Sequence, residues 1–186
     1  MLGRVTRARV TVTFLRMDGP PDWPAPKLPA DMRIIFMRNP SVPFYRYLYN
    51  TVGEDYLWWL NRVMSDADLA RMLANPAVTI HVLSKGEEVG GFFQLDASHW
   101  PDVNLSYFGL MPHMVGHRIG SAFLRCAVDE VWRSGATGMT VNTCTADHPR
   151  ALPNYLRAGF EVVRQVQETW AIPDELGMKI PPALRV

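Results

Sequence analysis

The pattern of hydrophobic and polar residues changes its period several times in the first half of the chain. From residue 10 to residue 14, valine and phenylalanine alternate with threonine, which predicts a half-buried strand. The prolines of residues 18–31 (DGPPDWPAPKLPAD) forbid regular structure and predict an extended connector. Residues 32–38 (MRIIFMR) then predict a strand. Residues 43–74 have helical spacing, in two or three pieces crowded with aromatic residues.

The second half alternates between strand and helix patterns. Two β-rich runs flank the turn sequence SKGE and predict a hairpin, and a third strand is stopped by Pro112. A helix with one apolar face is predicted over residues 119–134, and a short helix ends at Gly159. The strand patterns are residues 78–83, 88–96, 103–110, 138–144 and 161–170.

This order predicts an α/β (α+β) fold with a mixed central β-sheet flanked by helices. We expect a single domain over residues 1–186, in which residues 1–31 are an N-terminal strand and the proline-rich connector. The composition, 48% hydrophobic and 20% charged, is that of a globular protein. A formal net charge of +1 argues against nucleic acid as a partner. No apolar run approaches the roughly 20 residues needed to span a bilayer, so no membrane role is expected.

The two cysteines, Cys126 and Cys144, have no paired spacing, which suits a reducing compartment and predicts a cytoplasmic protein. His113 and His117 are four residues apart, a helical ligand spacing, but Pro112 and Gly116 argue against a helix there. No metal site is therefore predicted.

One loop, Val115–Gly120 (VGHRIG), stands between a predicted strand and a predicted helix. A helix N-terminus presents unpaired N–H groups and can bind phosphate without a basic side chain. Glycine helps because the backbone can then approach the phosphate closely. Alone, this loop favours a plain turn over a phosphate site.

The neighbouring segments change that interpretation. GLMPHMVGHRIGSAFL (109–124), followed by TVNTCTADHPRALPNYLRAGFEVV (140–163), resembles the acetyl-CoA-binding core of the GNAT N-acetyltransferase superfamily. The resemblance covers roughly residues 78–170; residues 1–77 match only loosely. The matching positions are Leu110, Met111, Pro112, Gly116, Ile119 and Gly120 in the first segment and Ala151, Tyr155, Gly159 and Phe160 in the second.

The resemblance implies a site for acetyl-CoA as co-substrate, without a metal. The implied cofactor-binding residues follow the strand end and the loop, and one precedes the last helix: Leu110, Met111, Val115, Gly116, His117, Arg118, Ile119, Gly120, Ser121 and His148. Three of them depart from the family's pattern: Val115 replaces Arg or Gln, Arg118 replaces the middle glycine, and His148 replaces Asn. With a negative φ at Arg118, its amide would still point at the phosphate; its side chain could crowd the pyrophosphate or contact it.

The resemblance also implies a mechanism. The acceptor amine attacks the thioester directly, and a backbone N–H near Leu110 polarises the carbonyl. Tyr155 is the implied general acid that protonates the departing sulfur; without the motif it would be a tyrosine packing on the sheet. No general base is assigned, although Glu54, Asp55, His81, Asp96 and His99 could reach the cleft. Asp147 is expected to be the N-cap of the last helix, with Pro149 in its first turn.

The predicted function is transfer of the acetyl group of acetyl-CoA to a primary amine of a small molecule. The alternative is a non-catalytic acyl-CoA-binding or protein-interaction domain with a GNAT fold. The aromatic residues of segment 44–59 are either core residues or the wall of an acceptor pocket. Such a pocket would suit a small amine with an apolar or aromatic body, a peptide N-terminus or a lysine. A homodimer is also considered, because the N-terminal strand and connector could pack against a second copy.

Overall fold

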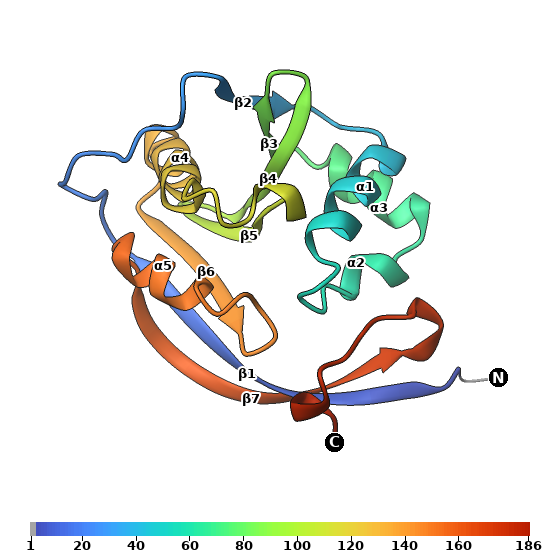
Figure 1. Ribbon diagram of the computed structural model, residues 1–186. Helices are drawn as coiled ribbons and strands as arrows, with labels where there is room; N and C mark the ends of the chain where they lie inside the picture. Colours follow the sequence, from blue (N-terminus) through green and yellow to red (C-terminus); the bar gives the residue numbers. More distant parts are fainter. Residues whose placement is uncertain (1–2) are drawn as a thin grey trace.

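The protein folds around one continuous mixed β-sheet. The computed structural model describes residues 3–186, which contain a seven-stranded sheet of order β2-β3-β4-β5-β6-β1-β7 (Figure 1). All neighbouring strands are antiparallel except β5 and β6. The strands are β1 (Val5–Met17), β2 (Met32–Met37), β3 (Val78–Lys85), β4 (Glu88–His99), β5 (Asp102–Leu110), β6 (Gly138–Cys144) and β7 (Glu161–Pro173). The predicted α/β class and mixed sheet are confirmed.

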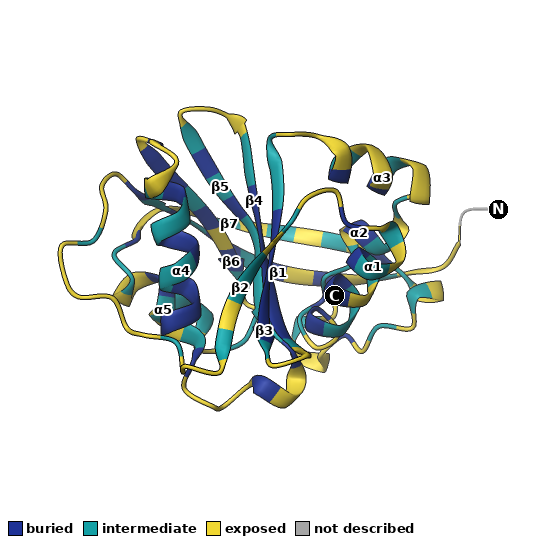
Figure 2. Ribbon diagram, turned by 90° about the horizontal axis from the view of Figure 1, so that it is seen from above, coloured by how far each residue is buried: buried dark blue, intermediate teal, exposed yellow. Residues whose placement is uncertain are grey.

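Helices cover both faces of the sheet. Seen from above, α4 and α5 lie on one face and α1, α2 and α3 on the other (Figure 2). The helices are α1 (Val42–Val52), α2 (Leu60–Val63), α3 (Asp66–Ala74), α4 (Gly120–Arg133) and α5 (Ala151–Arg157), with short 3₁₀ turns at Pro112–Met114, Asp174–Leu176 and Pro182–Leu184. The predicted helical region 43–74 therefore divides into three helices.

Local sequence explains where two of these helices begin. Ser41 accepts a hydrogen bond from the Phe44 amide at the start of α1. Ser65 accepts one from the Asp68 amide at the start of α3, where Asp66 and Asp68 also favour the positive end of the helix dipole. The helix α4 buries the predicted apolar face, with Phe123, Ala127 and Val131 in the core.

The strand β1 is more deeply embedded than the sequence predicts. It pairs with β6 on one edge and β7 on the other, so Val12 lies opposite both Cys144 and Val166. Both edges of β1 are thus used within the chain. The first half of the strand alternates between exposed and buried residues, but in the second half Thr13 is also buried. The half-buried strand expected from alternation is therefore wrong for this part of β1, where Val12 packs in one hydrophobic cluster and Leu15 and Met17 pack in another.

The parallel strands β5 and β6 pair at one end only. Their register runs from Asp102 opposite Gly138 to Leu105 opposite Val141. Beyond that point β5 continues to Leu110 and β6 to Cys144 without pairing to each other. The two strands consequently separate and leave an opening in the middle of the sheet.

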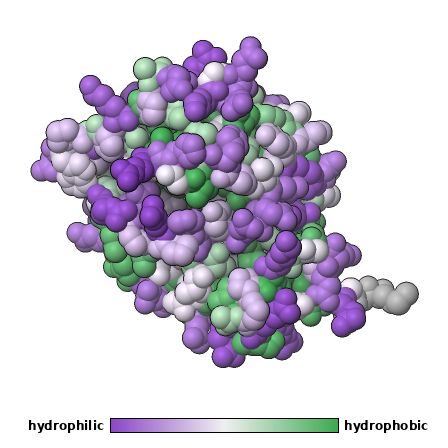
Figure 3. Space-filling model, in the orientation of Figure 1, coloured by the Kyte–Doolittle hydropathy of each residue, from purple (hydrophilic) through white to green (hydrophobic). Residues whose placement is uncertain are grey.

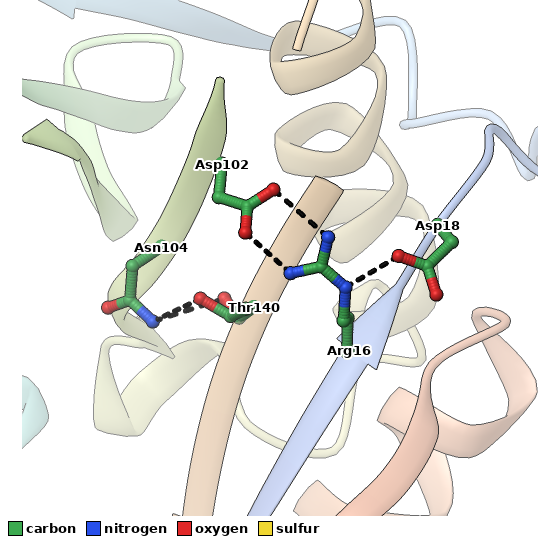
Figure 4. A network of polar contacts seen from close by, with 5 residues as sticks. All are labelled: Arg16, Asp18, Asp102, Asn104 and Thr140. Atoms are coloured by element: carbon green, nitrogen blue, oxygen red, sulfur yellow. Dashed lines mark hydrogen bonds and ion pairs between the residues drawn. The ribbon is translucent and has the colours of Figure 1, made fainter. Parts of the chain in front are cut away.

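A polar clamp holds the closed end of this opening (Figure 4). The Arg16 guanidinium donates to both carboxylate oxygens of Asp102, at 2.6 and 3.0 Å, and to Asp18 at 2.5 Å. Gly138 makes room for it, since a Cβ at that position would lie 2.3 Å from both Arg16 Nη2 and Asp102 Oδ1. Asn104 donates to the Thr140 hydroxyl at 2.9 Å and adds a second tie between β5 and β6. The clamp therefore links β1 and β5 across β6.

Candidate active site

A cavity of about 1200 Å³ lies where β5 and β6 separate. Its walls come from β1, the α1–α2 region, the open part of β5, the loop before α4, the end of β6, α5 and β7. The face of the molecule seen in Figure 1 is largely hydrophilic, with smaller hydrophobic patches between the polar side chains (Figure 3). This volume lies above the range of roughly 300–1,000 Å³ that is usual for small-molecule sites, so it leaves room for two substrates.

The loop before α4 leaves the N-terminus of that helix open. Gly116 has a φ of 90° and the helix begins at Gly120, with Ile119 at the N-cap and no side-chain cap. Gly116, Gly120 and Ser121 line the cavity. The first amides of α4 are therefore free of side-chain capping at the cavity wall, an arrangement that suits a phosphate.

Arg118 takes the backbone conformation that glycine would take. Its φ is 61°, in the left-handed region, so the negative φ considered from the sequence is wrong. A non-glycine residue there carries a backbone strain of roughly 1–2 kcal/mol. The side chain is exposed and lines the cavity. The loop thus keeps the geometry of a glycine at this position while presenting a guanidinium.

The structure brings most of the predicted cofactor-binding residues to the cavity. Seven of the ten line it: Leu110, Val115, Gly116, Arg118, Gly120, Ser121 and His148. The side chains of Met111 and Ile119 are instead buried in the core, and His117 is exposed outside the lining. A role for these three in binding the cofactor stays a prediction, as it does for the seven.

Backbone alternation directs the Leu110 amide into the opening. The Met111 amide donates to the Gly90 carbonyl, which lies on the β4 side. Because successive N–H groups of a strand point to opposite edges, the Leu110 N–H points to the other edge, where β6 no longer pairs. This donor has the place that polarisation of a thioester carbonyl requires.

Tyr155 reaches the cavity from α5. It lies in the lining, and its ring packs edge-on against Phe160 at 5.8 Å and Phe108 at 6.4 Å between centroids. Burial raises the pKa of Tyr155, and the nearby charge of Asp147 raises it further. The phenol is consequently kept protonated at neutral pH, which is the state that a general acid needs.

Asp147 does not have the structural role expected from the sequence. The N-cap of α5 is Arg150, without a side-chain cap, so an Asp147 cap is wrong. The Asp147 carboxylate instead turns back to the end of β6, where its Oδ2 accepts from the Thr143 hydroxyl at 2.6 Å and the Cys144 amide at 2.9 Å. Burial raises its pKa, although Thr143, Cys144 and the Trp58 indole oppose this effect.

This carboxylate is the functional candidate that the sequence did not reveal. None of the five candidate bases named from the sequence, Glu54, Asp55, His81, Asp96 and His99, is in the cavity lining, whereas Asp147 is. Glu168 of β7 also lines the cavity and accepts from the Trp170 indole at 2.7 Å. The available signal was the position of Asp147 directly after a strand that borders the opening.

The aromatic residues of segment 44–59 divide between the core and the cavity wall. Tyr45 and Tyr49 are buried in the core, the latter next to the cavity, whereas Tyr56, Trp58 and Trp59 line the cavity with partly exposed side chains, and an acceptor-pocket role for them stays a prediction. The indole of Trp58 lies between two glycines: a Cβ at Gly53 would be 2.4 Å from the Trp58 Cβ, and a Cβ at Gly109 would be 3.6 Å from its ring. Gly53 therefore leaves the room that Trp58 occupies, whereas a Cβ at Gly109 would make only an ordinary contact with the ring.

Neither cysteine nor histidine chemistry is indicated. Cys144 lines the cavity, but burial, with the Asp147 charge, raises its pKa to about 12 and keeps the thiol protonated. His81 is buried with its ring stacked on Phe93 at 4.6 Å. Within residues 3–186, no three His, Cys, Asp or Glu side chains gather as a metal site would require. In the same part of the chain, every helix is too short or too polar to cross a membrane.

Comparison with known proteins identifies the fold. No family model matches the sequence, and no curated protein matches it. Solved structures do match. A GCN5-related N-acetyltransferase from Sphaerobacter thermophilus has a TM-score of 0.60 and 19% identity, over 92% of this chain and 53% of its own. A tandem GNAT protein from the clavulanic acid biosynthesis pathway has a TM-score of 0.62 and 13% identity, over 90% of this chain and 55% of its own.

A third match is an aminoglycoside acetyltransferase from an uncultured soil metagenomic sample. Its TM-score is 0.55 at 15% identity, over 68% of this chain and 86% of its own. The chain has the GNAT fold, as the sequence resemblance predicted. It spans little more than half the length of the first two structures, so the likeness concerns one part of those proteins.

Proposed function

We propose that this chain is an acetyl-CoA-dependent N-acetyltransferase that transfers the acetyl group to a primary amine of a small molecule. One observation carries the proposal. The open edge of β5, the uncapped N-terminus of α4 and the phenol of Tyr155 all face the same cavity. They supply a carbonyl-polarising donor, a phosphate site and a proton donor around a single space.

Charge supports the placement of the cofactor. Arg118, Arg150 and Arg157 line the cavity on the side of α4 and α5. The phosphates of CoA are strongly anionic, and arginine forms charge-assisted hydrogen bonds with phosphate. Seven of the ten cofactor residues implied by the sequence line the same cavity. We therefore place the pyrophosphate at the α4 N-terminus and the pantetheine arm along the open edge of β5.

The chemistry follows from the residues around the thioester position. The Leu110 N–H stabilises the oxyanion that develops when the amine attacks. Tyr155 donates its proton to the sulfur as the carbon–sulfur bond breaks. Cys144 takes no part as a nucleophile, because its thiol stays protonated. Direct attack by the amine, without an acyl-enzyme, is therefore the mechanism that these groups support.

Two measurements test the proposal. First, CoA or acetyl-CoA should raise the melting temperature, since a ligand that binds only the native state stabilises it. Second, the protein should release free CoA thiol when acetyl-CoA is supplied with an amine. The absence of any thermal shift at millimolar CoA would overturn the assignment of the cofactor. Binding without turnover across a broad amine panel would favour a non-catalytic acyl-CoA-binding domain instead.

A further inference from the structure

Three aromatic rings form a compact cluster at the end of the cavity near α1. The centroids of Tyr49 and Tyr107 are 4.9 Å apart, those of Trp58 and Tyr107 5.0 Å, and those of Tyr49 and Trp58 5.4 Å. All three residues line the cavity. Tyr49 is buried in the core, so the ring faces open to a ligand are those of Trp58 and Tyr107, which are the kind of surface that attracts an organic cation.

A buried chain of hydrogen bonds fixes these rings. The Asn61 side chain donates to the Tyr45 hydroxyl at 2.7 Å, and that hydroxyl donates to Gln94 at 2.7 Å. The Asn61 amide donates to the Tyr49 hydroxyl at 3.3 Å, which in turn lies 3.4 Å from the Tyr107 hydroxyl. The phenols are thus engaged with one another and with α2, so the cluster is rigid before any ligand arrives.

A carboxylate borders the same space. Asp147 contacts the Trp58 indole, and its charge acts on Tyr56 and Tyr155. Both hydrogen bonds that anchor it end on Oδ2, so Oδ1 accepts neither of them. The acidic side chains that line the cavity are Asp147 and Glu168, and Glu168 is already engaged by the Trp170 indole.

The cavity lining also contains large apolar and aromatic residues, beside polar ones such as Ser106 and Asn142. The apolar and aromatic ones include Phe14, Leu57, Trp59, Leu60 and Trp170. A polyhydroxylated acceptor such as an aminoglycoside would leave many of its polar groups without partners there, at a large cost in affinity. Each further ammonium of a polyamine would likewise have to lose its hydration against this wall, which is costly for a charge. A single ammonium carried on an aromatic body matches both the apolar wall and the charge.

From this arrangement we infer that the acceptor is an arylalkylamine with one primary amino group. Its ammonium is bound between Asp147 and the rings of Trp58 and Tyr107, and Asp147 takes the proton that frees the nitrogen lone pair. The inference rests on the proposed acetyl transfer and assigns the acceptor and the base for it. It also explains why a carboxylate of raised pKa stands in this wall, since a stronger base accepts the proton more readily.

The reaction conserves its protons. One proton passes from the ammonium to Asp147, and the neutral amine forms the new carbon–nitrogen bond. The carbon–sulfur bond breaks as Tyr155 gives a proton to sulfur, and the nitrogen releases its second proton, which restores the Tyr155 phenol. Asp147 returns its proton to solvent. The net products are the amide, free CoA and one proton.

The test compares acceptors and non-reactive analogues in the whole chain. The wild-type protein is assayed for CoA release with 2-phenylethylamine, spermidine and kanamycin. Trimethyl(2-phenylethyl)ammonium, which cannot be acetylated, and neutral 2-phenylethanol are compared as inhibitors competing with the amine. We expect kcat/KM to be highest for 2-phenylethylamine, and the quaternary ammonium to bind at least about tenfold more tightly than the alcohol.

Two variants separate the parts of the inference. Asp147→Asn should lower kcat/KM for the amine at least about 100-fold, the usual scale for loss of an acid–base group, while the Kd for CoA changes less than twofold. Trp58→Leu should weaken the quaternary ammonium about tenfold, and it tests the site even if the Asp147 variant does not fold. Glu88→Gln is the matched control, because Glu88 is an exposed carboxylate in the β3–β4 hairpin. It should change neither kcat/KM for the amine nor the affinity for the quaternary ammonium.

Different outcomes would overturn the assigned acceptor, the assigned base and the acetyl transfer itself. Acetylation of spermidine or kanamycin in preference to 2-phenylethylamine would overturn the assigned acceptor and leave acetyl transfer intact. Full activity in a folded Asp147→Asn variant would overturn its role as base. Absence of CoA binding in the wild type would overturn the proposed function itself.

Discussion

Arg118 combines a backbone conformation that favours glycine with a charged side chain at the cavity. Its φ of 61° is one that glycine adopts without strain, yet the side chain faces a cavity that also holds Arg150 and Arg157. Because this strain costs stability, we infer that the guanidinium charge contributes to binding of the phosphates.

Two substitutions at this position separate strain from charge. Arg118→Gly should leave the free energy of unfolding unchanged or raise it by up to about 1 kcal/mol, because the left-handed backbone is relieved. The same variant should weaken CoA binding about five- to tenfold, the value of one charge-assisted contact. Arg118→Ala should weaken CoA equally without the gain in stability. Titration calorimetry measures the Kd for CoA, and urea denaturation measures the free energy of unfolding. Tighter CoA binding by Arg118→Gly would show that the side chain is an obstruction.

Individual site residues could be predicted from the sequence where they belong to a motif of known spacing. Tyr155 and the Val115–Gly120 loop could be placed because their spacing resembles a known core, and the structure brings them to one cavity. Asp147 could not be identified in that way. Its sequence neighbours suggest a helix cap, and only the turn of the chain after β6 directs the carboxylate into the cavity.

At the scale of elements, two glycines decide how α1 and its following loop meet the sheet. A Cβ at Gly109 would lie 2.3 Å from Val52 Cγ1, and one at Gly53 would lie 2.4 Å from the Trp58 Cβ. The wall made by Trp58 therefore depends on these two positions in addition to its own ring contacts.

Gly109→Ala should displace this wall. The extra methyl group overpacks the contact between β5 and α1 and should lower the free energy of unfolding by about 1–3 kcal/mol. It should also raise KM for the amine more than the Kd for CoA, since Trp58 is on the acceptor side. Gly19→Ala, where a Cβ meets nothing within 4 Å, is the control and should change neither quantity. Unaltered stability in Gly109→Ala would contradict the close packing described for this contact.

Most elements were predictable because their periodicity is strong. The hairpin of β3 and β4, the strand β6 and the helix α4 lie within a few residues of their predicted bounds. The burial of β1 was less predictable, because alternation reports one apolar face and cannot show that the strand contributes to two hydrophobic clusters. The division of residues 43–74 into three helices depended on caps at Ser41 and Ser65 and on the loop that places Trp58.

For the whole molecule, the partial pairing of β5 and β6 creates the site. The strands are held at Asp102–Leu105 and separate beyond it, while the Arg16 clamp closes the paired end. The order of strands around this opening, with β1 between β6 and β7, joins residues more than 120 positions apart. Local sequence patterns do not contain such pairings, so the topology rested on the family resemblance alone.

The clamp predicts how stability depends on pH. The Arg16 guanidinium lowers the pKa of Asp102 below its usual value of 3.8. A carboxylate whose pKa is lower in the folded state contributes its full stability above the unfolded pKa and loses it as the pH falls through the folded pKa. Asp102→Asn should therefore cost about 1 kcal/mol at pH 7, a modest value because the pair is partly exposed.

The difference between this variant and the wild type should shrink as the pH falls below about 4, where Asp102 takes up a proton in the unfolded protein, and should vanish below the folded pKa, where Asp102 is protonated in both states. Thermal denaturation of both proteins over this pH range measures the difference in stability. Asp18→Asn removes the more exposed partner of Arg16 and should have a smaller effect at every pH. A difference that stays constant down to pH 3 would contradict the role given to the ion pair.

The central claim is that the chain itself transfers an acetyl group within the cavity between β5 and β6, with Tyr155 as the acid. The most direct measurement is amine-dependent release of CoA thiol by the wild type and by Tyr155→Phe, together with the Kd of each for CoA. We predict that Tyr155→Phe lowers kcat at least about 100-fold and changes the Kd less than twofold. Equal turnover by the two proteins, or binding of CoA with no amine-dependent release by the wild type, would contradict the claim.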